Sequence, residues 1–376
     1  MNRIQVEPFG HGFDCADDET VLEGALRNGL FLRYGCKHGG CGTCTVRLVD
    51  GDVEDHGSSF ALSPADRAAD LVLACASIPL EPCVIDVEPS GLTEDEFFSG
   101  DRSRPHDTRL SSVRLLTGDI AAVSLDVVGD PIAFTAGQFV NVQIPGTDLV
   151  RTFSLANAPS DGRAIELIVK LYPGGAFSRF LREGAVAGVP VRVLGPYGRL
   201  RIHLSHRDVL MIAGGSGLAP LLSMLRELAD RADGADGAVR GFDRPVTLFF
   251  GARTADDLYL TDEIRRVGSR LRSFEFRPVL SESWPEAWAG ETGLVTDALR
   301  RWRPRLAHDV YLCGPPPMID AAVPLLTAAG VRPRNIYFDA FTPATQLSCA
   351  RRTEPSDLAR AGWLSSGGKG GGSGCH

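Results

Sequence analysis

The sequence predicts a multidomain protein in which an α+β domain, an antiparallel β-barrel domain and a doubly wound α/β domain follow one another. Three observations carry this prediction. A loop rich in Cys and Gly lies between short strand patterns near the start of the chain. Short apolar runs separated by Gly and Pro turns then extend from Asp107 to about His203, which is typical of a barrel or sandwich. From Asp208 onward, apolar strands alternate with helical patterns, which is typical of a parallel sheet.

We expect the first domain to cover residues 1–88. Thr20 and Glu23 form a possible capping box at the start of a helix, and Ser63 followed by Pro64 resembles a second helix start. The strand patterns of this domain are Asn2–Pro8, Thr45–Val49 and Cys83–Val87.

Four cysteines of this domain have the spacing of a plant-type 2Fe–2S site. Three follow the pattern C-x4-C-x2-C, and the fourth comes about thirty residues later. The four predicted ligands are Cys36, Cys41, Cys44 and Cys75. Glycines in the loop allow positive φ and let backbone N–H groups point at a negative cluster. The alternatives are free loop cysteines or a zinc site, but zinc favours two short C-x2–4-C pairs and only Cys41 and Cys44 form one. Residues 1–88 resemble a plant-type ferredoxin domain over their whole length.

Composition favours a cytoplasmic protein. No run of about eighteen apolar residues exists, so we expect no transmembrane helix, and the N-terminus lacks the apolar region of a signal peptide. Four of nine cysteines belong to the predicted cluster, which favours a reducing compartment. The formal charge of −8 does not suggest a nucleic-acid partner. Residues 1–88 hold 15 Asp and Glu against 6 Lys and Arg. This acidic domain is either an ordinary solvated surface or a surface that steers a basic partner.

The remaining boundaries follow from composition. Residues 89–106 are rich in Pro, Ser, Gly and charge, so we expect a linker that lets the first domain reorient. The barrel domain should cover residues 107–205 and the α/β domain residues 206–342. Residues 343–376 end in a Gly/Ser-rich stretch, which we expect to be a flexible tail, either native or engineered.

Each of the two later domains has a set of expected elements. The barrel strands are 110–116, 120–128, 139–144, 152–156, 164–171 and 189–194, with a helix at 176–181. The parallel strands are 209–213, 246–250, 274–280 and 310–312, with helices at 218–229, 260–267 and 316–329.

Three motifs in the barrel region, at 151–155, 170–178 and 195–198, together resemble the FAD-binding barrel of the ferredoxin–NADP reductase superfamily. Arg151 can form charge-assisted bonds to a pyrophosphate, and Ser154 can hydrogen-bond near the flavin atom that accepts hydride. Glycines open a helix whose N-terminus suits phosphate. The implied FAD residues are Arg151, Thr152, Phe153, Ser154, Lys170, Gly174, Gly175, Ser178 and Phe341. The alternative is an ordinary strand with glycine turns.

The α/β region contains a G-x-G-x-x-P variant of the dinucleotide fingerprint after a strand. With the Cys-Gly-Pro sequence at 313–315, it resembles the nicotinamide domain of the same superfamily. The implied nucleotide-binding residues are Gly215, Gly217, Pro220, Arg253, Cys313, Gly314 and Pro315. Arg253 could meet the 2′-phosphate of NADPH, but members with this pattern usually use NADH, which we favour. The resemblance places Ser154, Cys313, Asp339 and Phe341 at the hydride-transfer site. Core packing is the alternative for Phe341, and an ordinary buried thiol is the alternative for Cys313.

The domain order resembles the reductase components of bacterial multicomponent oxygenases. The stretches at 32–36, 151–159 and 336–339 look closest to reductases of soluble di-iron monooxygenases that act on phenol, toluene, alkenes or methane. The resemblance implies electron transfer from NADH through FAD and a 2Fe–2S cluster to a separate oxygenase or hydroxylase component, by a monomer. The alternatives are a reductase for a Rieske-type dioxygenase or a deoxysugar dehydratase, a quinone-reductase subunit, which the lack of an anchor disfavours, and a non-enzymatic electron carrier.

Overall fold

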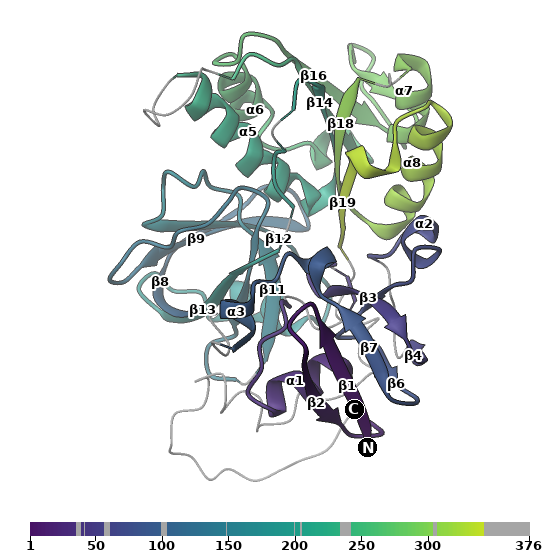
Figure 1. Cartoon of the computed structure of the whole chain (residues 1–376). Coiled ribbons are helices and arrows are strands. Elements are labelled where there is room, and N and C mark those ends of the chain that lie inside the picture. Colours follow the sequence, from purple (N-terminus) through teal and green to yellow (C-terminus); the bar gives the residue numbers. More distant parts are fainter. Residues whose placement is uncertain are drawn as a thin grey trace.

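The computed structural model describes residues 1–34, 39–40, 42–55, 61–98, 104–147, 149–198, 200–203, 205–233, 242–303 and 307–341. These residues form three domains: an N-terminal domain, a barrel domain and an α/β domain. In Figure 1 the α/β domain lies at the top, the barrel domain below it, and the N-terminal domain at the bottom. The predicted multidomain fold class is confirmed. No helix in the described part of the chain is both long and apolar enough to span a membrane.

The N-terminal domain is built on a mixed five-stranded sheet in the order β2-β1-β7-β3-β5. The Thr20–Glu23 capping box at the start of α1 is present as predicted. The elements are β1 (Asn2–Glu7), β2 (His11–Cys15), α1 (Val21–Arg27), β3 (Thr45–Asp50), β4 (Val53–Asp55), α2 (Pro64–Arg67), β5 (Leu71–Leu73), β6 (Ser77–Pro79) and β7 (Cys83–Asp86).

The expected linker at 89–106 is partly folded. It holds most of the turn η1 (Glu88–Ser90), helix α3 (Glu94–Phe98) and the first residues of strand β8. Phe97 is fully buried, with its ring 5.2 Å from that of Phe9. Glu96 accepts two hydrogen bonds from Arg33, at 2.7 and 2.8 Å. Because these contacts tie residues 88–98 to the N-terminal domain, the composition-based prediction of a linker is wrong for that segment.

The barrel domain is an antiparallel sheet in the order β11-β10-β13-β8-β9-β12. A single antiparallel bridge between Leu155 and Leu167 brings its first and last strands together. The elements are β8 (Arg104–Leu115), β9 (Ile120–Val127), β10 (Phe139–Gln143), β11 (Val150–Ser154), β12 (Ala164–Lys170), α4 (Ala176–Glu183) and β13 (Pro190–Tyr197).

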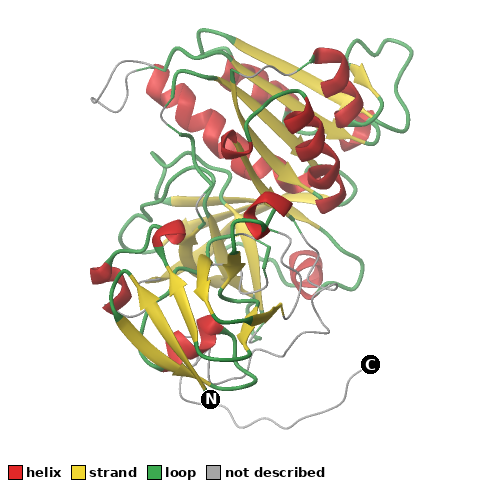
Figure 2. Cartoon of the chain, turned by 45° about the vertical axis from the view of Figure 1, so that its right-hand side comes forward, coloured by secondary structure: helices red, strands yellow, loops and turns green. Residues whose placement is uncertain are grey.

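The α/β domain contains a parallel sheet in the order β17-β16-β15-β14-β18-β19. Alternate residues of β14 pack on opposite faces: Met211 joins the core under α5 and α6, whereas Leu210 joins the core under α7 and α8. Figure 2 shows the helices on both sides of these strands. The elements are β14 (Asp208–Gly214), η2 (Gly215–Gly217), α5 (Leu218–Ala232), β15 (Val246–Ala252), η3 (Ala255–Asp257), α6 (Thr261–Gly268), β16 (Phe274–Leu280), β17 (Glu291–Thr292), α7 (Val295–Trp302), β18 (His308–Gly314), α8 (Pro316–Ala328), η4 (Pro333–Asn335) and β19 (Ile336–Ala340).

Helix α7 and strand β19 were not predicted from the sequence. Strand β19 lies at the edge of the sheet, where only its two end residues are buried. Its sequence therefore lacks the continuous apolar run expected of a buried parallel strand. Helix α7 has only eight residues, little more than two turns, so its periodicity is weak.

The barrel and α/β domains share one apolar core, which contains Ile168 of the barrel and Met224 of α5. Polar contacts reinforce the boundary. Arg226 of α5 donates to the carboxylates of Glu166 on β12 and Glu263 on α6. Ser223 donates to the carbonyl oxygen of Asn157 at 2.6 Å. The barrel domain and the α/β domain are therefore packed together as one unit.

Candidate functional site

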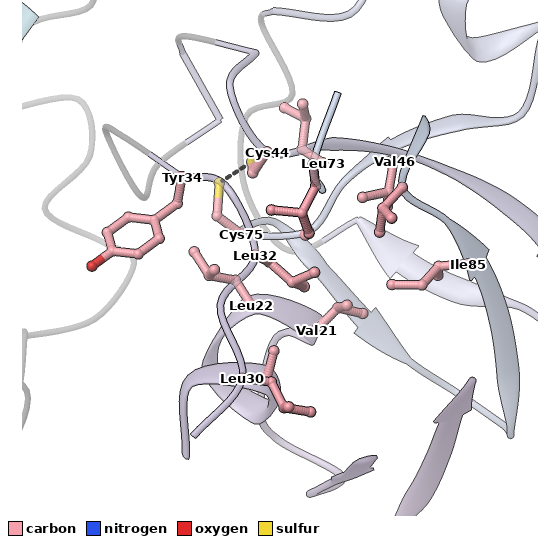
Figure 3. Close-up of a cluster of buried hydrophobic side chains, with 14 of the residues drawn as sticks. Val21, Leu22, Leu30, Leu32, Tyr34, Cys44, Val46, Leu73, Cys75 and Ile85 are labelled. Carbon is pink, nitrogen blue, oxygen red and sulfur yellow. Dashed lines mark hydrogen bonds between the residues drawn. The ribbon is translucent and has the colours of Figure 1, made fainter. Parts of the chain in front are cut away.

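The thiols of Cys44 and Cys75 converge in the N-terminal domain. Their Sγ atoms lie 3.2 Å apart, and both residues are buried. Figure 3 shows the pair at the edge of an aliphatic cluster, beside Tyr34. The other two predicted ligands, Cys36 and Cys41, lie outside the described residues.

Strand pairing explains why two cysteines 31 positions apart meet. Cys44 immediately precedes β3 and Cys75 follows β5, two strands that are antiparallel with Thr45 opposite Leu73. The Ala74 N–H also donates to the Cys44 carbonyl oxygen at 3.0 Å. Two thiolates that share one tetrahedral metal at bonds of about 2.3 Å lie just under 4 Å apart. Cys44 and Cys75, the described half of the predicted ligand set, therefore fit a thiolate-bound iron if their two Sγ atoms move slightly further apart.

The barrel motif lies on β11. Arg151 is half-buried, and burial lowers the pKa of its guanidinium. Its Nη1 donates to the Val150 carbonyl oxygen at 2.7 Å, and it forms no ion pair with any residue that the structure describes. A half-buried cation without a carboxylate partner is costly. The donor set therefore fits an anionic group such as the FAD pyrophosphate.

The rest of β11 is held by its neighbours. Thr152 donates its hydroxyl to Asn141 Oδ1 at 2.7 Å. The Phe153 ring packs 4.6 Å from that of Phe177. Ser154 is 6% exposed and pairs with Phe139 of β10. Burial and strand pairing therefore hold Ser154 on a packed strand at the end of the motif.

The glycine turn before α4 is the second part of this site. Gly174 adopts φ +71°, which favours glycine, and Gly175 is the N-cap of α4. The buried Ser178 hydroxyl accepts a hydrogen bond from the Tyr172 N–H at 2.9 Å. The side chain of Ser178 therefore shapes the turn, and the helix N-terminus supplies the favourable dipole for phosphate.

One carboxylate links the two sets of predicted nucleotide residues. Asp119 of the barrel accepts a hydrogen bond from Lys170, and its Oδ2 lies 3.6 Å from Nη2 of Arg253 in the α/β domain. Nη2 of Arg253 also lies 3.3 Å from Oδ1 of Asp257, and the charge of Asp257 raises the pKa of the guanidinium. Sequence analysis missed Asp119, because it stands in a turn outside the motifs.

The dinucleotide motif forms the junction between β14 and α5. A Cβ on Gly217 would lie 2.1 Å from the Cys313 carbonyl oxygen, so only glycine fits there. Gly215 adopts φ +54° and its carbonyl accepts a hydrogen bond from Tyr259 at 2.7 Å. Pro220 is buried in the first turn of α5. This close packing joins the glycine motif to the Cys-Gly-Pro motif.

The remaining predicted residues gather at the ends of β18 and β19. Cys313 pairs with Asp339, and the Phe341 N–H donates to the Gly314 carbonyl oxygen at 2.8 Å. Cys313 is fully buried, and burial raises the pKa of its thiol well above the usual range. The Pro315 N-cap starts α8 directly after them. The structure therefore brings Gly217, Cys313, Gly314, Asp339 and Phe341 together.

Three family models match consecutive parts of the chain. They are the 2Fe-2S iron-sulfur cluster binding domain at residues 4–80, the oxidoreductase FAD-binding domain at 107–202 and the oxidoreductase NAD-binding domain at 211–323. These matches confirm the predicted classes of cofactor and their order along the chain.

Relatives of known name match nearly the whole chain. The reductase component of propane 2-monooxygenase from Gordonia sp. (strain TY-5) is 36% identical over 348 residues, which is 91% of this chain and 97% of the relative. The reductase component of phenol 2-monooxygenase from Pseudomonas sp. (strain CF600) is 36% identical over 346 residues, 91% of this chain and 94% of the relative.

Solved structures of two reductases also match nearly the whole chain. The Amycolatopsis cytochrome P450 reductase GcoB superposes with a TM-score of 0.69 at 32% identity, over 92% of this chain and all of that chain. The ferredoxin reductase of carbazole 1,9a-dioxygenase has a TM-score of 0.64 at 28% identity, over 91% and 98% of the two chains.

Proposed function

We propose that this chain, which belongs to the family of monooxygenase reductase components, delivers electrons from NADH to the oxygenase component of a soluble di-iron monooxygenase. The enzyme class is an oxidoreductase with iron–sulfur, FAD-binding and NAD-binding domains. The observation that carries the proposal is the convergence of Cys44 and Cys75 in a chain whose barrel and α/β domains share a core.

Each group of residues has a separate task. Bound FAD supplies the change from two-electron to one-electron transfer, and a bound 2Fe–2S cluster supplies a one-electron relay. Arg151 and the turn at Gly174 and Gly175 would hold the FAD phosphates, while Ser154 would orient the ring. Cys36, Cys41, Cys44 and Cys75 would hold the iron.

The residues proposed for the hydride site pack closely on one another. Gly217 lets the glycine motif pack on Cys313. Cys313 is fully buried, and burial raises the pKa of its thiol well above the usual range, so it would lie at the site as a neutral thiol. The Phe341 N–H bond to Gly314 keeps the end of β19 beside this motif.

NADH is favoured over NADPH by the surroundings of Arg253. Arg253 follows β15, the strand next to β14, where the ribose of a dinucleotide is usually recognised. It already faces Asp257 and Asp119, and the charge of Glu282 also acts on it. A 2′-phosphate would therefore meet a guanidinium that is already paired with carboxylates, and these carboxylates would repel it.

The proposal also names the type of oxygenase that receives the electrons. Relatives are named for propane and phenol monooxygenases, which supports an oxygenase of that type. A structural relative is named for carbazole 1,9a-dioxygenase, so a Rieske-type dioxygenase is the second candidate. We also propose a cytoplasmic monomer.

Two measurements test the function. First, purified protein should contain FAD and iron, and anaerobic NADH should bleach its visible absorbance. Protein that is free of flavin after gentle purification, and that NADH does not bleach, would contradict the reductase function. Second, cross-linking in the native host followed by metal analysis should capture an oxygenase with two carboxylate-bridged irons; a Rieske centre would move the partner to the dioxygenase class.

A further inference from the structure

The N-terminal domain and the barrel domain meet through aromatic rings. Tyr34 of the N-terminal domain and Tyr197 of β13 have ring centroids 5.9 Å apart, and Tyr197 lies 5.8 Å from Phe139 of β10. All three side chains are between 3% and 6% exposed and belong to the same apolar cluster as the N-terminal core. The row of rings is therefore part of a packed contact between two domains.

Each end of the row lies next to a predicted cofactor residue. Tyr34 stands two positions before Cys36 in the sequence. Figure 3 shows its ring turned away from Leu30 and Val21, on the side of the cluster where the Cys44 and Cys75 sulfurs meet. At the other end, Phe139 is directly paired with Ser154. The contact thus runs from the beginning of the iron-binding loop to the strand next to the flavin motif.

We infer that Tyr34, Tyr197 and Phe139 are positioning residues that hold the iron-binding domain against the flavin domain while the cluster is reduced. This inference rests on the proposed function. NADH supplies the electrons; the cluster takes them up one at a time, and no bond is made or broken at the rings. Electron transfer between two sites slows steeply with their separation, so the contact sets the rate by keeping the separation short.

The geometry favours positioning over ordinary core packing. Aromatic pairs with ring centroids about 4.5–7 Å apart have directional preferences that aliphatic contacts lack, so they fix orientation as well as proximity. Leu194 of β13 belongs to the same cluster. The contact therefore also contains an aliphatic side chain, which would remain in variants that lose a ring.

The test removes rings from either side. The variants are Tyr34→Leu and Tyr197→Leu, with Tyr34→Phe and Tyr197→Phe as conservative partners. Phe98→Leu is the matched control, because Phe98 is an aromatic of the N-terminal domain that packs on His11 and Phe97 instead. Iron and FAD are quantified in every variant. Stopped-flow mixing with NADH then separates flavin bleaching from cluster reduction.

We expect both Leu variants to reduce the cluster at least tenfold more slowly. Tyr34→Leu should keep NADH-to-ferricyanide activity within twofold, because Tyr34 lies outside the nucleotide motifs. The Phe variants and Phe98→Leu should match the wild type. If Tyr34→Leu loses iron, Tyr197→Leu decides the result from the barrel side. Cluster reduction at the wild-type rate in a Leu variant with full cofactor content would overturn the inference.

Hydrogen exchange gives a second readout that does not need activity. Amides at residues 30–34 and 193–197 should exchange faster in the Leu variants than in the wild type and the Phe variants. Unchanged exchange would refute the docking contact itself. If wild-type protein showed no NADH-dependent cluster reduction, the proposed function would fall, and the exchange data would still decide whether these rings hold the two domains together.

Discussion

Gly217 packs against the carbonyl oxygen of Cys313 so closely that a methyl group at Gly217 would lie 2.1 Å from it. This contact joins the two nucleotide motifs, which are almost a hundred residues apart. Replacing Gly217 by Ala should separate β18 from the α5 junction. We expect a KM for NADH raised at least tenfold and a lower melting temperature, since overpacking costs about 1–3 kcal/mol.

The control for this substitution is Gly184→Ala. A Cβ at Gly184 would make only ordinary contacts with Phe180. Steady-state kinetics with NADH and ferricyanide, together with thermal melts, compare the two variants. An unchanged KM in Gly217→Ala would show that the packing is not needed for the nucleotide.

Replacing Cys44 by Ser should remove the cluster and spare the flavin. The serine hydroxyl is a poor substitute for a thiolate ligand, and Cys75 would lose its neighbour at 3.2 Å. Cluster absorbance and cytochrome c reduction should disappear, whereas NADH-to-ferricyanide activity should remain. Cys83→Ser is the control, because Cys83 is a buried free cysteine outside the spacing motif. Loss of both activities would mean that the domains are not independent.

Asp119→Asn should weaken the discrimination against NADPH. The change removes one carboxylate near Arg253, which would then meet a 2′-phosphate more readily. Arg253 is more than half exposed, and exposed ion pairs contribute about 0.2–1 kcal/mol. The NADPH-to-NADH ratio of kcat/KM should therefore rise by up to about fivefold, more at low salt. Asp262→Asn, at a fully exposed position, should leave the ratio unchanged, and an unchanged ratio in Asp119→Asn would refute the role.

Arg151→Gln should have opposite effects on the two forms of the protein. Without FAD, removing a half-buried cation that has no carboxylate partner among the described residues should raise the melting temperature slightly. With FAD, the loss of charged hydrogen bonds worth about 1.5–3 kcal/mol should weaken binding by about ten- to hundredfold. Flavin-fluorescence titration and thermal melts measure both effects. Arg182→Gln, in the last turn of α4, is the control. An undiminished FAD affinity would contradict the assignment.

Cys313 should make stability fall at alkaline pH. Its folded pKa is raised by burial, whereas an unfolded cysteine ionises near pH 8.5. Between these two values the folded state binds one more proton than the unfolded state, so stability falls as pH rises. Each such thiol contributes a slope of about 1.4 kcal/mol per pH unit. Urea titrations from pH 8 to 10 should show a slope smaller by this amount in Cys313→Ser; an equal slope would contradict a neutral thiol.

Local sequence signals predicted the backbone features around the candidate site well where they depend on a few neighbouring residues. The capping box at Thr20, the N-cap glycine at Gly175 and the strand-to-helix junction at Gly215 and Gly217 all appear as expected. Each depends on a few neighbouring residues, so a short motif is sufficient to reveal it. Helix α3 also carries such a signal, because Thr93 and Glu96 form a capping box, but the composition of the segment concealed it.

The sequence by itself determined the order of the three domains and the classes of cofactor, and it supplied candidate residues to hold them, because iron ligation and phosphate binding require particular residue types at particular spacings. Tertiary structure alone decided that Cys44 and Cys75 meet at 3.2 Å, that Asp119 lies between Lys170 and Arg253, and that Tyr34 packs on Tyr197. These contacts join segments far apart in the chain. Their partners are chosen by how strands and domains pack, and no local pattern of residues records that choice.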